Sequence, residues 1–216
     1  MEVSAFHTAF LAIFCIVPVL SQRSCKINDF DVQRNFRPER FSGVWHLVGY
    51  NRMLSPVTRL PPRIKSISTR YVKSRYYLGA DGRGFIMSNG QVTVTLQNGY
   101  QFTRCERVDF STIMEEGSRP VMDLIQVTGR RRGSITRSHI METDYNNYAV
   151  RYTCEEELNN GRCAPDKDHL WVLRKDNATF ALTPTQIQNI MSRLCISGSY
   201  VQSPIGEECP VPTMSI

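Results

Sequence analysis

Residues 143–174 read TDYNNYAVRYTCEEELNNGRCAPDKDHLWVLR, and this stretch decides the fold. Two extended runs, 148–154 and 168–174, are rich in Tyr, Val, Thr and Trp, which suit a pleated and half-buried surface. Between them, the Asn-Asn-Gly sequence at 159–161 consists of residues that favour turns. The stretch therefore predicts an antiparallel hairpin.

The first strand of this hairpin presents two different faces, because successive side chains of a strand point to opposite sides. One face carries Tyr148, Val150, Tyr152 and Cys154, and the other carries Ala149, Arg151 and Thr153. Both faces are too apolar for plain solvent exposure, apart from Arg151. A strand covered on both sides indicates a barrel or a sandwich with a further element packed outside. We expect a disulfide between Cys154 and Cys163 to staple the connection of the hairpin.

The element that can cover this strand follows it in the chain. Thr183 and Gln186 form a capping box, and Pro184 occupies the first helical position, where its missing N–H is tolerated. The apolar residues that follow at helical spacing are Ile187, Ile190, Met191 and Leu194. Gly198 can end the helix. We expect this helix to dock on the domain and to have no part in ligand binding.

The chain opens with a short apolar run at 9–20, which fits a secretory signal peptide and is too short to span a bilayer comfortably. We expect residues 1–21 to be this signal peptide and residues 22–216 to form a single domain. No later run of the sequence could span a membrane. The mature protein is therefore expected to be soluble, secreted and extracellular.

Cleavage would remove Cys15 and the acidic Glu2, leaving six of the seven cysteines and raising the formal net charge from +6 to +7. An even number of cysteines in an exported chain predicts three disulfides, for which the sequence alone permits 15 pairings. Asn177 begins an Asn-Ala-Thr sequence in a polar loop before the helix. We expect Asn177 to be glycosylated, which is consistent with export.

Upstream of the hairpin, short strands alternate with turns. Residues 25–41 are expected to form an ordered N-terminal arm, and residues 52–64 a proline-rich loop. The expected strands are 41–48, 68–78, 83–95, 100–111, 121–128 and 136–144, with breaks at 79–82, 98–99, 116–117 and 129–133. We interpret Asn89-Gly90 as a bulge. Together with the hairpin, these make eight strands before one helix, which predicts an antiparallel barrel.

Three short motifs resemble those of the lipocalin family. They are Gly43-x-Trp45 on the first strand, Thr143-Asp144-Tyr145 before the seventh strand, and Arg174 at the end of the eighth. The chain is most similar to the retinol-binding protein and purpurin branch, over essentially the whole mature sequence. The resemblance implies an all-β fold: an eight-stranded antiparallel up-and-down barrel with one C-terminal α-helix packed outside.

The resemblance also implies particular contacts. The disulfides of the branch correspond to Cys25–Cys195, Cys105–Cys209 and Cys154–Cys163. In the family, the arginine that ends the eighth strand stacks on the tryptophan of the first strand. Arg174 is therefore expected to stack on Trp45 and close one end of the barrel, a structural contact without a catalytic part.

An eight-stranded barrel has room for side chains or for one small ligand. The expected function is that of a secreted lipid-binding transport protein, which carries one small hydrophobic ligand such as a retinoid or a fatty acid; a sterol or a bilin is also possible. No cofactor is expected. The residues expected to line the ligand site are Leu47, Ile86, Ser88, Val92, Val94, Met122, Leu124, Arg151, Leu170 and Val172.

An alternative is a protein that acts through its surface. Basic residues are expected to gather near one rim of the barrel: Arg59, Arg63, Lys65, Arg70 and Arg130-Arg131-Arg132. Such a rim could bind an anionic surface or a cell-surface receptor. The loop at 52–66 and the three arginines depart from the retinol carriers, so neither their ligand nor their thyroxine-transport partner is carried over to this chain.

Other classes fit the sequence poorly. An enzyme is not expected, because the implied disulfides use all six mature cysteines and no Ser/His/Asp set stands out. A metal site is not expected either, because the four histidines, His7, His46, His139 and His169, lack the spacing of metal ligands. Nucleic acid is not an expected partner of an exported protein without stacking aromatic residues on its basic face.

Arg151 is the unusual residue of the central strand. The resemblance places the Tyr148 row under the helix, which turns Arg151 toward the barrel interior, where the retinol carriers have a neutral polar residue. An arginine stays charged and is unfavourable to bury without a partner. It can reach water at the barrel mouth, pair with Asp123 or Asp168, or bind the carboxylate of an acidic ligand. Our hypothesis is the last of these.

Overall fold

The computed structural model describes residues 24–51, 61–114, 120–128, 132–165, 167–196 and 198–213. Several expectations fall outside these ranges: the signal peptide at 1–21, the break at 116–117, and Arg59, Arg130 and Arg131. The described elements are η1 (Ile27–Asp29), α1 (Pro38–Phe41), β1 (Gly43–Asn51), β2 (Ile64–Leu78), β3 (Gly84–Leu96), β4 (Gln101–Met114), β5 (Val121–Gln126), β6 (Ile135–Thr143), β7 (Tyr148–Cys154), β8 (Asp168–Lys175), α2 (Pro184–Arg193) and β9 (Tyr200–Gln202).

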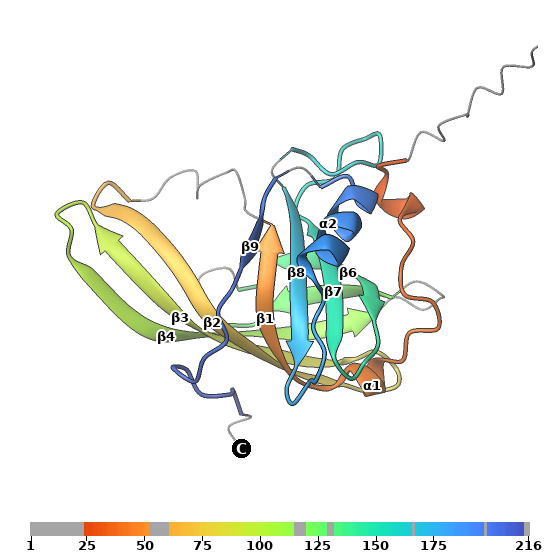
Figure 1. The fold of residues 1–216 in the computed structure, drawn as a ribbon, viewed down its shortest axis with the longest axis horizontal. Helices are drawn as coiled ribbons and strands as arrows, with labels where there is room; N and C mark the ends of the chain where they lie inside the picture. The colour runs from red at the N-terminus through yellow and green to blue at the C-terminus, as the bar shows by residue number, and fades with distance from the viewer. Residues whose placement is uncertain are drawn as a thin grey trace, which may run out of the picture.

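The strands form one antiparallel sheet in the order β2-β3-β4-β5-β6-β7-β8-β1-β9 (Figure 1). A further pairing between β2 and β1 closes the first eight strands into a barrel. The expected eight-stranded antiparallel barrel with one external α-helix is confirmed.

The short strand β9 was not expected. It occupies the edge of β1 at Gly49–Asn51, while β2 pairs with β1 only from Gly43 to His46. A side chain at Gly49 could not coexist with this contact, because an added Cβ would lie 1.8 Å from the Tyr200 hydroxyl. That hydroxyl donates instead to the Val48 carbonyl at 3.2 Å.

The sequence prediction of a bulge at Asn89-Gly90 was wrong about the strand that carries it. β3 pairs with β4 in unbroken register through both residues. The irregularity lies in the neighbouring strand β2, between Arg70 and Lys73, where Tyr71 has a φ of 54°. Two residues of β2 therefore oppose Gly90, which bends β2 away from β1.

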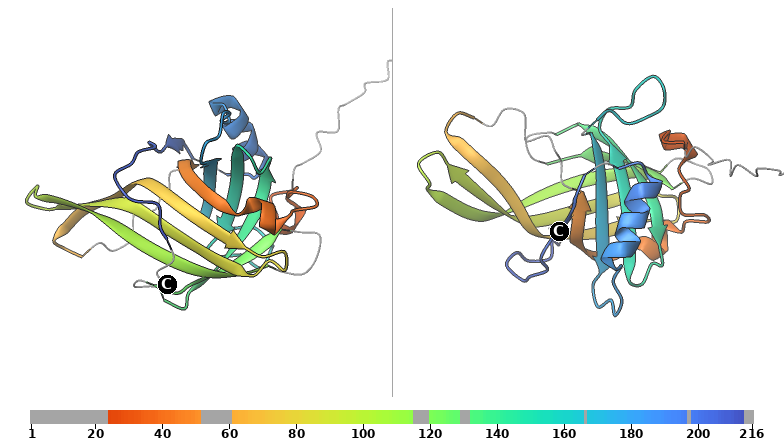
Figure 2. Two further views of the ribbon diagram at one scale, coloured as in Figure 1. Left: turned by 90° about the horizontal axis from the view of Figure 1, so that it is seen from below. Right: turned by 45° about the horizontal axis from the view of Figure 1, so that its top comes forward.

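The helix α2 packs on the outer face of the β7–β8 hairpin (Figures 1 and 2). Thr183 and Gln186 form the expected capping box, with Pro184 at the first helical position. The helix ends at Arg193, so the prediction that Gly198 ends it was wrong. Cys195 takes the left-handed conformation instead, with a φ of 55°, and the Ile196 N–H bonds to the Met191 carbonyl at 3.0 Å.

The three disulfides join Cys25 to Cys195, Cys105 to Cys209 and Cys154 to Cys163, as the resemblance implied. The first ties the N-terminal arm to the end of α2. The second holds the C-terminal tail against β4. The third closes the β7–β8 connection.

Aromatic residues close the end of the barrel beneath α1. Trp45 is fully buried, stacks on Phe41 with ring centroids 4.8 Å apart, and donates its indole N–H to the Phe41 carbonyl at 2.8 Å. The cation over the Trp45 ring is Lys175, whose Nζ lies 4.7 Å from the ring centroid and donates to the Ser42 carbonyl at 2.7 Å.

The expected stacking of Arg174 on Trp45 was therefore wrong. Lys175 lies opposite Trp45 in the β1–β8 register, and Arg174 belongs to the alternate row of β8. Its guanidinium donates to the Ala178 carbonyl at 3.3 Å on the outer side of the sheet.

The Thr143-Asp144-Tyr145 motif forms the turn between β6 and β7. The Asp144 carboxylate accepts the backbone N–H groups of Asn146, Asn147 and Tyr148 at 2.7–3.1 Å. Burial acts to raise the pKa of Asp144, but the side-chain and backbone hydrogen bonds outweigh it and lower the pKa below the usual value of 3.8. The turn is therefore held by an ionised carboxylate.

Replacing Lys175 with Met should lower the free energy of unfolding by about 1 kcal/mol, because Trp45 loses its cation and the carbonyls of Ser42 and Arg40 lose a donor. Removing the charge offsets part of this loss of stability, because burial disfavours the charged form and lowers the pKa of Lys175. Arg174→Met is the matched control and should change stability by less than about 0.5 kcal/mol. Denaturant unfolding of both variants measures this, and a larger loss in Arg174→Met would contradict the assignment.

Asp144→Asn should reduce stability at neutral pH but not in acid. Because the folded-state pKa lies below the unfolded-state value, the stabilisation is present above the unfolded pKa and is lost as pH falls through the folded pKa. Urea unfolding across this range should show the two proteins converging below about pH 4. Asp31→Asn, which removes an exposed carboxylate, serves as the control. A stability difference between Asp144→Asn and the wild type that does not vary with pH would exclude the mechanism.

Candidate ligand site inside the barrel

The inner face of the barrel begins with an apolar cluster at the closed end. Four residues that the sequence predicted to face inward, Leu47, Ile86, Met122 and Leu124, belong to this cluster together with Trp45. Their inward orientation is confirmed, and their contact with a ligand stays a prediction.

Two predicted lining residues lie on the wrong side of the sheet. Leu170 is paired with Tyr152 and Val172 with Val150, and directly opposite residues of a strand pair share a face. All four pack against α2 in the outer core, so the inward placement of Leu170 and Val172 was wrong. The residues of β8 that face the interior are Trp171 and Leu173.

The other predicted residues of β3 lie along the inward row but nearer the open end. The Ser88 hydroxyl is 2.8 Å from the Ser74 hydroxyl, so a neighbouring strand already satisfies it. At the level of Val92 and Val94, β2 and β4 have no further partner strand, because β1 meets β2 only at residues 73–76 and β5 meets β4 only at residues 110–114. These two valines therefore line the extension of the sheet beyond the closed part of the barrel.

Arg151 faces the interior, as the resemblance implied. Its guanidinium donates to the Tyr76 hydroxyl at 2.9 Å, and its central carbon lies 5.5 Å from the centroid of the Trp171 ring. Tyr76 belongs to the closed-end cluster, so the guanidinium lies directly above the aromatic floor. The Arg151 guanidinium thus places a positive charge in the barrel interior.

No carboxylate pairs with Arg151 among the residues that the structure describes. Asp123 pairs instead with Arg137, with 3.2 Å between Oδ1 and Nε. Asp168 belongs to the outer row of β8 with Leu170. The internal ion pair considered from the sequence is therefore absent from the described part of the chain.

Arg151 is half-buried, and its partner Tyr76 is fully buried. Burial raises the pKa of Tyr76, although the positive charge of Arg151 and its hydrogen bond act in the opposite direction. The Nε of Arg151 is itself buried and lacks a hydrogen-bond partner. A buried, unsatisfied donor of a charged group is unfavourable, so this site favours an acceptor with negative charge.

Two more polar groups lie beside this site. Thr153 accepts the Trp171 indole N–H at 3.2 Å. The Ser138 hydroxyl, directly across from Thr153, is fully buried without a hydrogen-bond partner. The sequence analysis did not identify Tyr76 or Trp171 as site residues. Trp171 could have been identified from the predicted hairpin, because it lies opposite Arg151 in the β7–β8 register and therefore shares its face.

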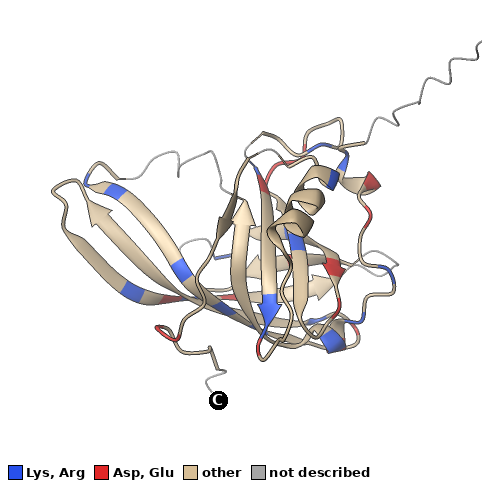
Figure 3. Cartoon of the chain, in the orientation of Figure 1, with Lys and Arg blue, Asp and Glu red and all other residues tan. Residues whose placement is uncertain are grey.

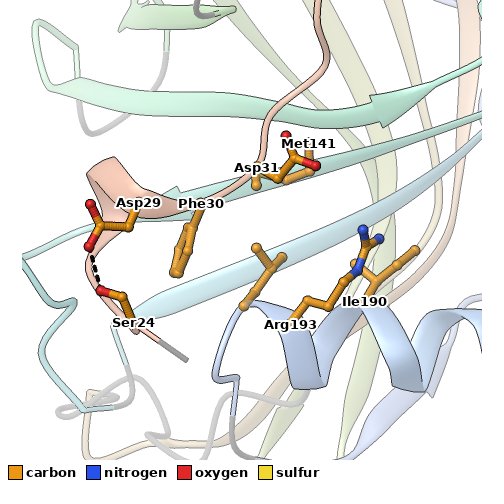
Figure 4. Close-up of a pocket in the computed structure, with 8 residues that line it drawn as sticks. Ser24, Asp29, Phe30, Asp31, Met141, Ile190 and Arg193 are labelled. Carbon is orange, nitrogen blue, oxygen red and sulfur yellow. Dashed lines mark hydrogen bonds between the residues drawn. The ribbon is translucent and has the colours of Figure 1, made fainter. Parts of the chain in front are cut away.

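Outside the barrel, a shallow pocket lies between the N-terminal arm and α2 (Figure 4). Phe30 and Ile190 line it together with acidic Asp29 and Asp31. Its charged groups have partners: Arg193 binds Glu142 at 3.0 Å, and Ser24 binds Asp29. This pocket offers a ligand no unsatisfied group comparable to Arg151.

The described residues contain no group of three or more His, Cys, Asp or Glu side chains positioned to hold a metal ion. None of their helices is long and apolar enough to cross a membrane.

The strand order and the single external helix define a barrel of the lipocalin type. No family model matches the chain. Retinol-binding protein 4 of Rattus norvegicus is 21% identical over 180 residues, covering 83% of each chain. The same protein of Gallus gallus is 22% identical over 194 residues, covering 88% of this chain and 90% of the relative. Purpurin of Gallus gallus is 23% identical over 201 residues, covering 88% and 92%.

Among solved structures, insecticyanin from Manduca sexta is 16% identical, with a TM-score of 0.49 and coverage of 82% of this chain and 85% of that one. The chain has the lipocalin fold, as the strand pairing and the external helix show. Over most of its length it is similar in sequence to retinol-binding protein 4 and purpurin.

Proposed function

We propose that this chain is a secreted carrier that holds one small apolar acid, such as a retinoic or fatty acid, with the carboxylate on Arg151. The lipocalin relatives support a carrier of a small hydrophobic ligand. The observation that carries the finer proposal is the unpaired guanidinium inside the barrel. Arg151 has five N–H donors, and among the described residues one hydrogen bond is made, to the neutral Tyr76 hydroxyl.

A carboxylate would relieve this arrangement in two ways. It would neutralise a half-buried charge, and it would accept two parallel hydrogen bonds from the guanidinium. The Trp171 ring covers one face of the guanidinium, which leaves the N–H groups in the guanidinium plane for a ligand. A neutral alcohol could accept only one such bond.

The interior also suits the apolar part of such a ligand. Several inward apolar side chains are only partly buried; they include Tyr50, Val72 and Phe110. We infer that the acid enters head first and that its tail extends from the aromatic floor toward the open end.

Secretion and the absence of catalysis belong to the same proposal. The three disulfides suit an oxidising extracellular compartment. All six cysteines of the described residues are bonded, so a catalytic thiol of the kind used by a lipocalin isomerase is not among them. Asn177 lies exposed in the loop after β8, where a glycan could be attached.

The experiment compares retinoate with retinol, which differ at the head group. Wild type should bind retinoate about 10- to 100-fold more tightly, the range expected for a charged hydrogen-bonded contact. Arg151→Met should erase this preference while leaving retinol binding nearly unchanged. Quenching of tryptophan fluorescence on titration measures both affinities.

Arg137→Met is the matched control, because it removes an arginine that pairs with Asp123. It should retain the preference for the acid. Arg151→Met should also be at least as stable as wild type when empty, because it removes an unpaired charge from the interior. Equal binding of retinol and retinoate by the wild type would refute the role of Arg151.

A further inference from the structure

Three strands continue beyond the barrel as a ribbon, to which the Cys105–Cys209 disulfide ties the C-terminal tail. Residues 64–72 of β2, 89–96 of β3 and 101–108 of β4 pair only with one another. β1 reaches β2 only at residues 73–76, and β5 reaches β4 only at residues 110–114. Figures 1 and 2 show this three-stranded ribbon projecting away from α2 and the rest of the barrel.

One row of side chains across the ribbon is apolar and exposed. Ile67, Val94 and Phe102 lie directly opposite one another across the three strands. This row continues the inward face of β3 toward the tip, yet Ile67 is 45% exposed and Phe102 is 39% exposed. The opposite face is polar: Thr93 and Thr103 pair there through their hydroxyls at 2.9 Å. The ribbon is therefore amphipathic near its tip, whereas the ion pair of Arg104 and Glu106 follows on the same face toward the base.

The tip adds an exposed aromatic ring. Tyr100, which is 62% exposed, follows the turn at Asn98-Gly99. The Gln97 N–H donates to the Arg63 carbonyl at 3.0 Å, which holds the start of β2 beside this turn. Tyrosine is enriched where proteins meet the boundary between lipid and water.

The charge of the ribbon is positive near the tip. Arg63 and Lys65 are exposed at the tip, and Arg70 is exposed nearer the base, opposite Gln91; within the described ranges none of the three forms an ion pair with a carboxylate. The acids lie farther back, where Glu106 binds Arg104 and Asp109 binds Arg107. Figure 3 shows basic residues along the ribbon and acidic ones only toward its base.

We propose that the ribbon docks tip first on an anionic lipid surface. Tyr100, Phe102 and Ile67 enter the headgroup region, while Lys65, Arg70 and Arg63 contact anionic headgroups. The combination of an exposed apolar row with unpaired cations carries this proposal, because neither feature alone requires a membrane. A second copy of this chain is a poor occupant, since a symmetric contact would bring like charges together. The inference is independent of the ligand at Arg151.

The test is flotation of the full chain with phosphatidylcholine vesicles, with and without phosphatidylserine. Wild type should bind the anionic vesicles, and added salt should weaken the binding. The double variant Lys65→Gln, Arg70→Gln should bind about thirtyfold more weakly. Phe102→Ser, which leaves the charge unchanged, should bind about tenfold more weakly.

Two matched controls lie at the opposite end of the strands. Arg83→Gln removes an exposed cation, and Phe85→Ser removes a phenylalanine that is 49% exposed. Both should bind as wild type does. Thermal unfolding should show that all variants remain folded, because each substitution is on an exposed side chain.

Three results would overturn the proposal. One is equal binding to neutral and anionic vesicles. Another is a loss of binding in the charge variant with no effect of Phe102→Ser, which would indicate attraction to polyanions without entry into lipid. The third is a wild-type dimer in sedimentation that Phe102→Ser converts to a monomer, which would make the apolar row a subunit interface.

Discussion

The pairing register of β7 with β8 determines what the barrel contains. Tyr152 opposite Leu170 and Val150 opposite Val172 form one apolar surface, and α2 covers it. Because strand side chains alternate, this outer packing turns Arg151 and Trp171 toward the interior. A shift of one residue would exchange the two faces and bury Tyr152 and Val150 inside the barrel. The Cys154–Cys163 disulfide limits such a shift by fixing the connection between the strands.

This register creates an unfavourable charge burial that the described residues do not offset. The outer row gains hydrophobic burial against α2, and the same alternation places a guanidinium in the barrel interior. Tyr76 provides one neutral acceptor and Trp171 one aromatic face. Neither neutralises the charge, and the described part of the chain provides no carboxylate to do so. The carboxylate of the proposed acidic ligand would supply the missing negative charge.

Much of the fold could be predicted from local sequence. The eight strands, the capping box at Thr183 and the inward direction of Arg151 follow from alternation, turn residues and a family resemblance. The disulfide pairing came from the resemblance, because the cysteines alone permitted many arrangements. The wrong predictions concern side-chain directions that depend on how one strand pairs with another. Leu170 and Val172 were placed inward although their partners Val150 and Tyr152 were placed under the helix, and the hairpin register does not allow both.

The remaining misses have similar causes. Arg174 follows the row of Leu170, so the residue over Trp45 is its neighbour Lys175. β9 is only three residues long and forms because the bend in β2 leaves an edge of β1 open, which no local pattern reveals. The helix ends at Arg193 because a disulfide-bonded cysteine adopts the conformation usually taken by glycine. Tyr76 was missed because its partner Arg151 is 75 residues away in sequence.

The most direct measurement of the central claim is native mass spectrometry of the protein as it is released from cells, followed by identification of the molecule that it retains. The account predicts one bound molecule per barrel and a carboxylic acid with an apolar chain or ring system. A barrel that retains a neutral alcohol or ester, or no ligand at all, would contradict it.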